Sequence, residues 1–431
     1  MRILKLTEDT RKDILQNLLK RSPNNYGEFE GRVNAIIEEV RNNRDQAVFN
    51  YTKQFDGADI NAGNILVTEE EIAEAYEQVD TTLLAVIRKS LVNIKKYHEK
   101  QVQNSWFTTE DGIILGQKVT ALATVGVYVP GGKAVYPSSV LMNVLPAKVA
   151  GVDRIVMCTP PGKDGKVYPS TLVAAKEAGV DEIYKVGGAQ AIAAMAFGTE
   201  SVPKVDKIVG PGNIYVALAK KAVFGYVSID SIAGPSEILV LADGTANPRY
   251  VAADLLSQAE HDEMASAILV TTSEELAKKV SAQIDEFLKE LSRSEIISKS
   301  LENYGYILVA DSIDEAIEVA NDIASEHLEI VTKDPFNVMT KIKNAGAIFL
   351  GEYSSEPLGD YFAGPNHVLP TNGTAKFFSP LSVDDFIKKS SIISYSREAL
   401  ELIHNDIETF AKAEHLTAHA NSIHVRFEGD K

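Results

Sequence analysis

Cysteine is almost absent from this sequence. Among 431 residues there is one, Cys158, and it cannot form a disulfide within the chain. The sequence therefore excludes the class of small secreted proteins that disulfides hold together. A run of about 18 apolar residues is also missing, which argues against a membrane-spanning helix. The first residues, MRILKLTEDTRKD, become charged too soon for a signal peptide, so we expect a cytoplasmic protein.

Positive charge is the second shortage. Lysine and arginine together number 43, against 60 aspartates and glutamates, so the net charge is −17. Such a surface repels phosphate backbones and anionic lipids, and we expect neither nucleic-acid nor membrane binding through a broad basic face. Hydrophobic residues make up 45% of the chain and charged residues 24%, which is typical of a folded protein with a sizeable core. The length corresponds to roughly three domain-sized units.

The spacing of apolar residues changes near Trp106. Before it, residues 27–104 have apolar positions at helical spacing and predict several helices, and residues 1–24 are expected to form a polar helical arm. After it, short apolar runs alternate with Gly-rich turns and helical segments, which predicts parallel βαβ units and an α/β fold. The predicted strands are Val125–Val129, Arg154–Cys158, Glu182–Val186, Lys207–Val209, Ile238–Leu241, Ala267–Thr271, Tyr306–Val309 and Ala347–Leu350.

Three strand–glycine–helix junctions, at 130–132, 187–188 and 210–212, are candidates for a nucleotide site. None of them is a GxGxxG fingerprint, so a standard dinucleotide site does not follow from the pattern. Glycine lets backbone amides approach a ligand, and helix N-termini at the carboxyl ends of parallel strands attract phosphate. Ordinary βα turns explain the same pattern, and both interpretations stay open.

Four of the eight histidines lie close to other groups that bind metals or transfer protons. The clusters are Gln258 with His261 on one helix face, Glu326 beside His327, Asp360 with His367 around a Gly/Pro loop, and Glu414 with His419 near the C-terminus. Neutral imidazole and carboxylate are good Zn²⁺ ligands. Each pair alone is more often a surface pair, but four together favour a metal or acid–base site. Cys158, in an apolar strand, is expected to be a small buried hydrophobe.

Several longer stretches are similar to the histidinol dehydrogenase family. They are VGVYVPGGKAVYPSSVLMNVLPAKVAG (125–151), VGGAQAIAAMAFGTESVPKVDKIVGPGN (186–213), AGPSEILVLAD (233–243), DLLSQAEH (254–261), SEHLEI (325–330), GDYFAGPNHVLPT (359–371) and EHLTAHANS (414–422). Their order and spacing agree with the family from about residue 25 onward. The resemblance implies oxidation of L-histidinol to L-histidine with two NAD⁺, through a bound histidinaldehyde, as the last step of histidine biosynthesis.

The resemblance also implies one zinc ion and a role for each matching residue. The implied zinc ligands are Gln258, His261, Asp360 and His419, the acid–base pair is Glu326 and His327, and the cofactor contacts are Tyr128, Gln190 and Asn213. The implied substrate contacts are Ser236, Gln258, His261, His327, Asp360, His367, Glu414 and His419. The family is a homodimer in which the C-terminal arm of one subunit completes the site of the other, so Glu414 and His419 would come from the partner chain.

The chemistry of these residue types agrees with such roles. An alcohol oxidation needs a base for the hydroxyl proton, and the imidazole of His327 titrates near neutrality. The second oxidation adds water to the aldehyde, and the neighbouring Glu326 can activate that water. Four protein ligands would close a tetrahedral zinc site. We therefore interpret zinc as an anchor for the imidazole and amine of histidinol, which would expand its coordination.

Three other functions fit the sequence less well. A dehydrogenase on the same scaffold that acts on another alcohol, such as a sulfonated diol, would need a cationic site for the sulfonate. A zinc hydrolase would use Glu326 to activate water without a cofactor, which leaves the three Gly-rich junctions unexplained. A binding module without chemistry does not need acid–base residues clustered in loops.

The expected architecture has two Rossmann-like α/β units, one inserted in the other. The cofactor unit, 124–236, would be inserted in a larger substrate and zinc unit made of 25–123 and 237–380. The ends, 1–24 and 381–431, would be helical arms that embrace the partner subunit. Near the C-terminus the sequence predicts a short β-like stretch at 422–426.

Overall fold

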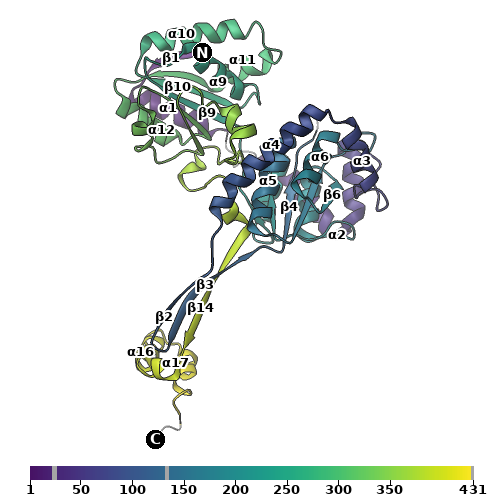
Figure 1. Ribbon diagram of the computed structural model, residues 1–431, viewed down its shortest axis with the longest axis vertical. Helices are drawn as coiled ribbons and strands as arrows, with labels where there is room; N and C mark the ends of the chain where they lie inside the picture. The colour runs from purple at the N-terminus through teal and green to yellow at the C-terminus, as the bar shows by residue number, and fades with distance from the viewer. Residues whose placement is uncertain (22–26, 132–134, 429–431) are drawn as a thin grey trace. The chain divides into compact units, whose positions relative to one another are not determined.

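The computed structural model describes residues 1–21, 27–131 and 135–428. The chain divides into two compact units. The first consists of Met1–Gln101 and Leu122–Phe386, and the second of Val102–Ala121 and Ile387–Lys431. Within the described residues, the first unit contains two parallel sheets covered by helices (Figure 1), which confirms the predicted α/β fold.

One parallel sheet has six strands in the order β1-β11-β10-β9-β12-β13. The strands are β1 (Arg2–Lys5), β9 (Glu237–Ala242), β10 (Ser266–Thr271), β11 (Gly305–Val309), β12 (His327–Val331) and β13 (Ala347–Leu350). One face packs on α9 (Pro248–Ala259), α10 (Glu274–Phe287) and α11 (Ser294–Tyr304). The other packs on α1 (Glu8–Leu19), α12 (Ile313–Ile323) and α13 (Pro335–Met339). Successive residues of β9 point to opposite faces, so Val240 contributes to one core and Leu239 to the other.

The first residues do not form the helical arm that the sequence predicts. Arg2–Lys5 pairs in parallel register with Tyr306–Val309 and extends the six-stranded sheet. The segment is short and has only two apolar residues, Ile3 and Leu4, between two charged ones, so it shows no long apolar run; charged residues are common on edge strands. The helix begins only after Thr7, whose side chain accepts a hydrogen bond from the Thr10 backbone. Residues 22–24 of the predicted arm lie outside the described residues.

The other parallel sheet has five strands in the order β6-β5-β4-β7-β8. They are β4 (Thr124–Tyr128), β5 (Arg154–Thr159), β6 (Glu182–Lys185), β7 (Lys207–Val209) and β8 (Ser228–Ile229). On one face α5 (Pro137–Ala150) and α6 (Pro169–Ala178) pack together with α3 (Glu69–Gln78) and α4 (Thr81–His98). On the other face α7 (Gly188–Phe197) and α8 (Ile214–Val223) pack with α2 (Gly27–Asp56). All eight predicted strands are confirmed, each to within one residue at either end.

The short elements of the first unit connect these layers. They are η2 (Glu99–Gln101), α14 (Glu356–Leu358), the π-helical turn η3 (Gly359–Ala363), η4 (Thr374–Lys376) and η5 (Val383–Phe386). Between them runs the loop that carries His367. This region has little regular structure of its own, which is common for segments that carry binding residues.

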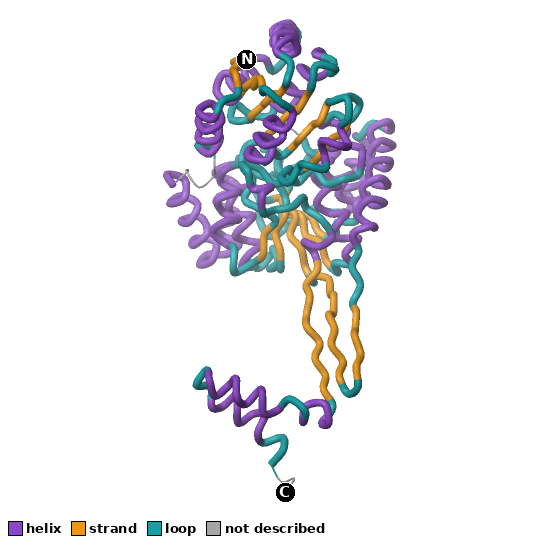
Figure 2. Tube along the Cα trace, turned by 90° about the vertical axis from the view of Figure 1, so that its left-hand side faces the viewer, coloured by secondary structure: helices purple, strands orange, loops and turns teal. Residues whose placement is uncertain are grey.

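The second unit is a long antiparallel ribbon with helices at its end (Figure 2). Its strands are β2 (Trp106–Glu110), β3 (Ile113–Ala121) and β14 (Ile387–Tyr395), in the order β14-β3-β2. Its helices are α15 (Arg397–Glu401), α16 (His404–Ala413) and α17 (Thr417–His424). A helical region throughout 381–431 is therefore wrong for β14, which pairs along its whole length with β3. The β-like stretch at 422–426 is also wrong, because its first residues end α17.

Two sequence-based exclusions can be compared with the structure. Cys158 is fully buried in β5, and burial raises the pKa of its thiol to about 12. This confirms a structural hydrophobe, since a thiol that stays protonated is a poor nucleophile. No helix in the described part of the chain combines the length and the apolar character that a membrane span requires.

Candidate active site

The cofactor residues predicted from the sequence lie near the carboxyl edge of the five-stranded sheet. Its order means that the chain moves from β4 to one side and later returns to the other side as β7. Ligands of open α/β sheets bind outside the carboxyl ends of the strands at this switch point. Tyr128 is the last residue of β4, and Gly210 follows β7 directly. The topology thus makes this edge a candidate nucleotide site.

The three predicted cofactor residues differ in the hydrogen bonds that they already make within the protein. Gln190, in the first turn of α7, is buried, and its Oε1 has no hydrogen-bond partner among the described residues. The buried Tyr128 hydroxyl accepts a hydrogen bond from the backbone N–H of Gly188 at 3.1 Å. Asn213 is exposed and caps α8, where its Oδ1 accepts from the Tyr215 backbone at 3.0 Å. A buried acceptor without a partner costs free energy, so Gln190 fits a ligand site best.

The glycines of the predicted junctions are explained largely by packing within the protein. A Cβ on Gly187 would lie 2.5 Å from the Cβ of Pro160. A Cβ on Gly210 would overlap the carbonyl oxygen of Tyr128. Gly132, in the first junction, lies outside the described residues. Ordinary βα turns are therefore sufficient for these glycines, and support for a cofactor site comes from the switch point and the buried amide.

The predicted acid–base pair lies at the amino end of the six-stranded sheet. Glu326 precedes β12 and His327 begins it, beside the first residues of β9. Both side chains are buried. The backbone N–H of Glu237 donates to Glu326 Oε2 at 2.9 Å, and the backbone oxygen of the same residue lies 3.0 Å from His327 Nδ1. One residue of β9 therefore orients both members of the pair.

This contact also fixes the tautomer of the neutral His327 ring. A carbonyl oxygen only accepts, so Nδ1 carries the hydrogen and Nε2 keeps its lone pair. Nε2 is buried and has no hydrogen-bond partner in the described part of the chain, and Asp360 Oδ1 lies 3.4 Å away. In the neutral ring, Nε2 is therefore the nitrogen that can take a proton from a bound molecule.

Burial of Glu326 and the carboxylates near His327 favour the protonated forms of the pair. Burial raises the pKa of the Glu326 carboxyl to about 8. Burial alone lowers the pKa of the His327 imidazole, but the carboxylates of Glu326 and Asp360 outweigh it and raise that pKa to about 10. His327 Nδ1 and Glu326 Oε2 lie 3.8 Å apart, so the two groups bind and release protons as a pair. Such a pair suits proton transfer to and from a substrate.

Asp360 brings several of the predicted residues together. It lies in η3, and its backbone oxygen is 3.0 Å from His367 Nδ1. Burial raises the pKa of its carboxyl, but the His327 ring 3.4 Å away and the charges of His367 and His261 outweigh it, and the pKa is lowered. A cavity of about 770 Å³ lies beside Asp360 and His367 and offers room for a small substrate.

Gln258 is a predicted metal ligand with an unsatisfied buried atom. It stands at the end of α9, is buried, and its Oε1 has no partner among the residues that the structure describes. His261 follows the helix and is exposed. Together with Asp360 they offer nitrogen and oxygen donors, which Zn²⁺ accepts. The residues present therefore fit a zinc ion.

Glu356 belongs to this site and was missed in the sequence. Its carboxylate, His327 and Asp360 offer potential ligand atoms that all lie within 4.8 Å of one another. Glu356 is buried, its side chain accepts a hydrogen bond from Ser257, and burial raises its pKa to about 7. Its position four residues before Asp360 was the available signal, because that spacing places two residues on one helix face.

The surroundings of the remaining predicted residues do not test their roles. Ser236 precedes β9 and is half-buried. His367 Nε2 lies 3.4 Å from the Ser139 hydroxyl of α5. Glu414 and His419 belong to the second unit, where both side chains are exposed. Their roles stay predictions.

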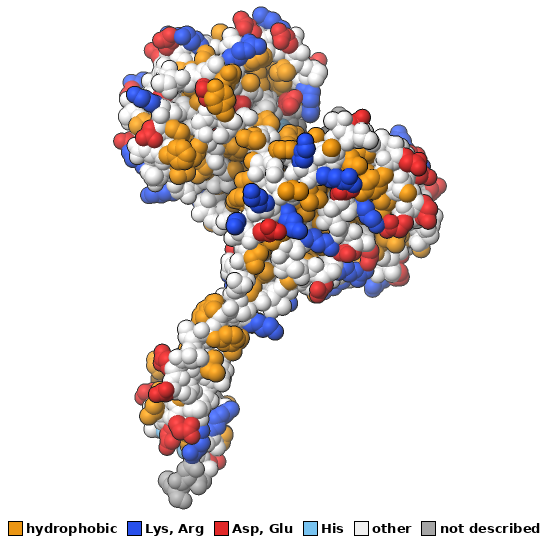
Figure 3. Space-filling view, in the orientation of Figure 1, with side chains coloured by type: hydrophobic (Ala, Val, Ile, Leu, Met, Phe, Trp, Pro, Cys, Tyr) orange, Lys and Arg blue, Asp and Glu red, His pale blue; other side chains and the backbone are white. Residues whose placement is uncertain are grey.

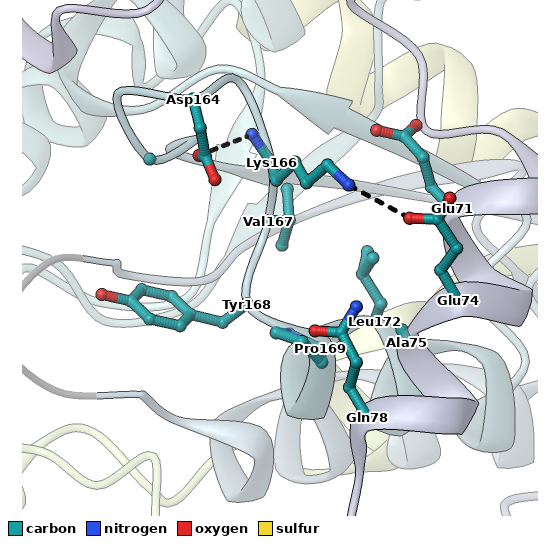
Figure 4. Close-up of a pocket in the computed structure, with 11 residues that line it drawn as sticks. Glu71, Glu74, Ala75, Gln78, Asp164, Lys166, Val167, Tyr168, Pro169 and Leu172 are labelled. Carbon is teal, nitrogen blue, oxygen red and sulfur yellow. Dashed lines mark hydrogen bonds and ion pairs between the residues drawn. The ribbon is translucent and has the colours of Figure 1, made fainter.

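A smaller cavity of about 260 Å³ lies between α3 and the segment that leads into α6 (Figure 4). Lys166 reaches across its edge to Glu74, with Nζ 3.1 Å from Oε2. None of the predicted site residues lines it, and no buried unpartnered polar atom of the described residues does so. We assign no ligand to it.

Comparisons with known proteins agree over nearly the whole chain. The sequence model of the histidinol dehydrogenase family matches residues 19–427. A histidinol dehydrogenase of Bacillus subtilis (strain 168) is 61% identical over 395 residues, covering 91% of this chain and 92% of that protein. One from Caldanaerobacter subterraneus subsp. tengcongensis is 57% identical over 424 residues, 98% of each chain.

A solved structure supports the same assignment. Histidinol dehydrogenase from Elizabethkingia anophelis superimposes with a TM-score of 0.93 at 40% identity and covers 99% of this chain and 98% of its own. At this level of similarity both the fold and the family are established. The chain therefore belongs to the histidinol dehydrogenase family of oxidoreductases.

Proposed function

We propose that this protein oxidises L-histidinol to L-histidine with two NAD⁺, as the last step of histidine biosynthesis. The alcohol carbon gives up one hydride in each of two steps, with L-histidinaldehyde held between them. A water oxygen enters the carboxylate, and three protons are released. The observation that carries the proposal is the contact of both Glu326 and His327 with the Glu237 backbone beside Asp360. The named relatives supply the substrate.

In this proposal His327 is the general base. Its Nδ1–H is held by the Glu237 carbonyl, so once the ring has released its second proton, Nε2 takes the hydroxyl proton of the alcohol. Glu326 activates the water that adds to the aldehyde and passes on its proton. Both groups are buried, and exclusion of bulk water protects a reactive aldehyde from side reactions.

The hydride acceptor and the metal are assigned to separate groups of residues. Tyr128, Gln190 and Asn213 are proposed to hold NAD⁺, which supplies the hydride-accepting ring. The proposed zinc ligands are Gln258, His261, Asp360 and His419. When bound, Zn²⁺ supplies an anchor for the imidazole and amine nitrogens of histidinol. Ser236, His367 and Glu414 are proposed to complete the substrate contacts. A cytoplasmic location is part of the same proposal.

A homodimer with shared sites is supported by the surface of the second unit (Figure 3). Its described residues bury only three hydrophobic side chains, those of Ala399, Ala411 and Ala420. Large apolar side chains remain exposed on both its strands and its helices. Those with more than half of their surface exposed are Trp106, Phe107, Ile393, Leu402 and Phe410. A unit without a core of its own is expected to bury these groups against a second copy.

The first test is the number of NADH formed per L-histidinol consumed, with and without a zinc chelator. We expect two NADH, lost on chelation and restored by added zinc. One NADH would remove the role given to Glu326 in the second oxidation. No NADH would reject histidinol as the substrate, and sulfonated diols would be the next alcohols to test. Activity that survives complete removal of the metal would reject the zinc assignment.

Tyr128→Phe tests the proposed cofactor edge. The variant leaves the Gly188 N–H without its acceptor, and a hydrogen bond has a net value of about 0.5–1.5 kcal/mol. We expect the KM for NAD⁺ to rise about 2- to 10-fold, with little change in kcat. The matched control is Tyr184→Phe, because that buried hydroxyl contacts Glu182 in β6. Equal effects of both variants on KM would argue against a cofactor role for Tyr128.

A further inference from the structure

Arg21 is a fully buried arginine to which the proposed mechanism gives no role. It follows α1 by two residues and is the largest fully buried side chain of the described residues. Its Nη1 donates to the backbone oxygen of Met264 at 2.9 Å. Its Nη2 forms an ion pair with the carboxylate of Glu237, which is buried as well. The guanidinium also lies over the ring of Tyr304, 5.2 Å from its centroid.

Stability alone does not account for this pair. A buried ion pair often stabilises a fold no better than two apolar side chains of similar size, because both charges lose their hydration. The position of the pair is more informative. Glu237 is the first residue of β9. It pairs with Ser266 of β10, whereas the pairing of β9 with β12 begins one residue later, at Ile238. Its side chain is the part that Arg21 holds, and its backbone is the part that contacts Glu326 and His327.

We propose that Arg21 is a positioning residue for the oxidation and acts through Glu237. The guanidinium links the Glu237 carboxylate to the Met264 carbonyl, and so fixes the backbone that orients the acid–base pair. The inference rests on the proposed function, because it assigns a role in the reaction of that site. Arg21 touches neither Glu326 nor His327, and it precedes His327 by more than two-thirds of the chain.

Positioning matters here because proton transfer depends steeply on geometry. A misplacement of about 1 Å costs about 10²-fold in rate. The planar fork of arginine reaches two acceptors at once, whereas lysine offers a single point charge. The proposal therefore predicts that a positive charge at position 21 does not by itself maintain the full kcat.

Three variants separate positioning from stability. Arg21→Lys keeps the charge, and we expect kcat to fall about tenfold or more. Arg21→Met leaves Glu237 buried without a counter-ion, and kcat and thermal stability should both fall. The double variant Arg21→Met/Glu237→Met replaces the pair by apolar side chains of similar length. It should recover the melting temperature, while kcat stays at least about tenfold below that of the unchanged protein.

The matched control is Arg154→Met. Arg154 pairs with Glu182 at the amino end of the other sheet, with Nη2 2.6 Å from Oε1, and we expect its loss to leave kcat unchanged. The affinity for NAD⁺ alone and the zinc content are measured for every variant, and both should be retained. If Arg21→Met fails to fold, Arg21→Lys and the double variant still distinguish a positioning role from a structural one.

Two outcomes would overturn the inference. Recovery of both melting temperature and kcat in the double variant would show that the pair only neutralises charge. A normal kcat in Arg21→Lys would show that the fork is not needed. Neither outcome touches the proposed function, which fails instead if the unchanged protein makes no NADH from histidinol.

Discussion

The His327→Asn variant is expected to lose about 10²- to 10⁴-fold in kcat, the range that a positioned general base contributes. The asparagine amide keeps a donor for the Glu237 carbonyl, now 3.0 Å from His327 Nδ1. It has no lone-pair nitrogen where Nε2 lies. The variant therefore removes proton transfer while it retains the contact with the Glu237 backbone. NADH formation at saturating histidinol and NAD⁺ measures the effect.

A second buried histidine provides the control. His98 is fully buried, and its Nδ1 lies 2.7 Å from Gln101 Oε1. His98→Asn should lower thermal stability and leave kcat within a factor of about two, because single core changes act mainly on folding. The affinity of His327→Asn for NAD⁺ should match that of the unchanged protein. If His327→Asn kept more than half of its kcat, another group would have to be the base.

The parallel strands were predictable because their signal is local. A strand buried on both faces of a parallel sheet is a continuous apolar run, such as Ile238–Leu241, and glycine or proline marks its ends. β14 has no such run. Its sequence IKKSSIISY is mostly exposed, and its partner β3 lies far earlier in the chain. Nothing within nine residues distinguishes that strand from a polar helix.

The same distinction applies to the site. Glu326 and His327 are neighbours in sequence, so their cooperation was visible, and the match to the family gave their roles. Glu237 was missed because it acts through its backbone, which no side-chain pattern reveals. Arg21 was missed because its partner is 216 residues away. Long-range pairs of this kind become visible only when the strands that carry them are assembled.

The topological rule for ligand sites agrees with one group of predicted residues and not with the other. The rule that ligands bind at the carboxyl ends of parallel strands identifies the edge that carries Tyr128. Glu326 and His327 lie at the amino end of β12 instead. Strands β9–β13 repeat the order of the five-stranded sheet, yet the proposed site residues lie at opposite edges of the two sheets, so the rule alone does not find the pair at β12.

The second large effect is a gain of activity from two inactive variants. His419→Ala removes a proposed zinc ligand on the second unit, and His327→Asn removes the base on the first. Each alone is expected to be nearly inactive. If sites are shared across a symmetric dimer, each mixed dimer contains one site with both changes and one site with neither. Random mixing makes half of the dimers mixed, so activity should recover to about a quarter of the unchanged protein.

The matched control pairs two changes on the same unit. Gln258 and His327 both belong to the first unit, so every site of a mixed dimer of Gln258→Leu and His327→Asn carries one change. That mixture should stay inactive, although its subunits exchange equally well. Recovery in both mixtures would indicate contamination or reversion. No recovery in either, with exchange demonstrated by differently tagged chains, would mean that each chain builds its site alone. His419 would then have to reach Asp360 of its own subunit, and the exposed apolar side chains of the second unit would need another partner.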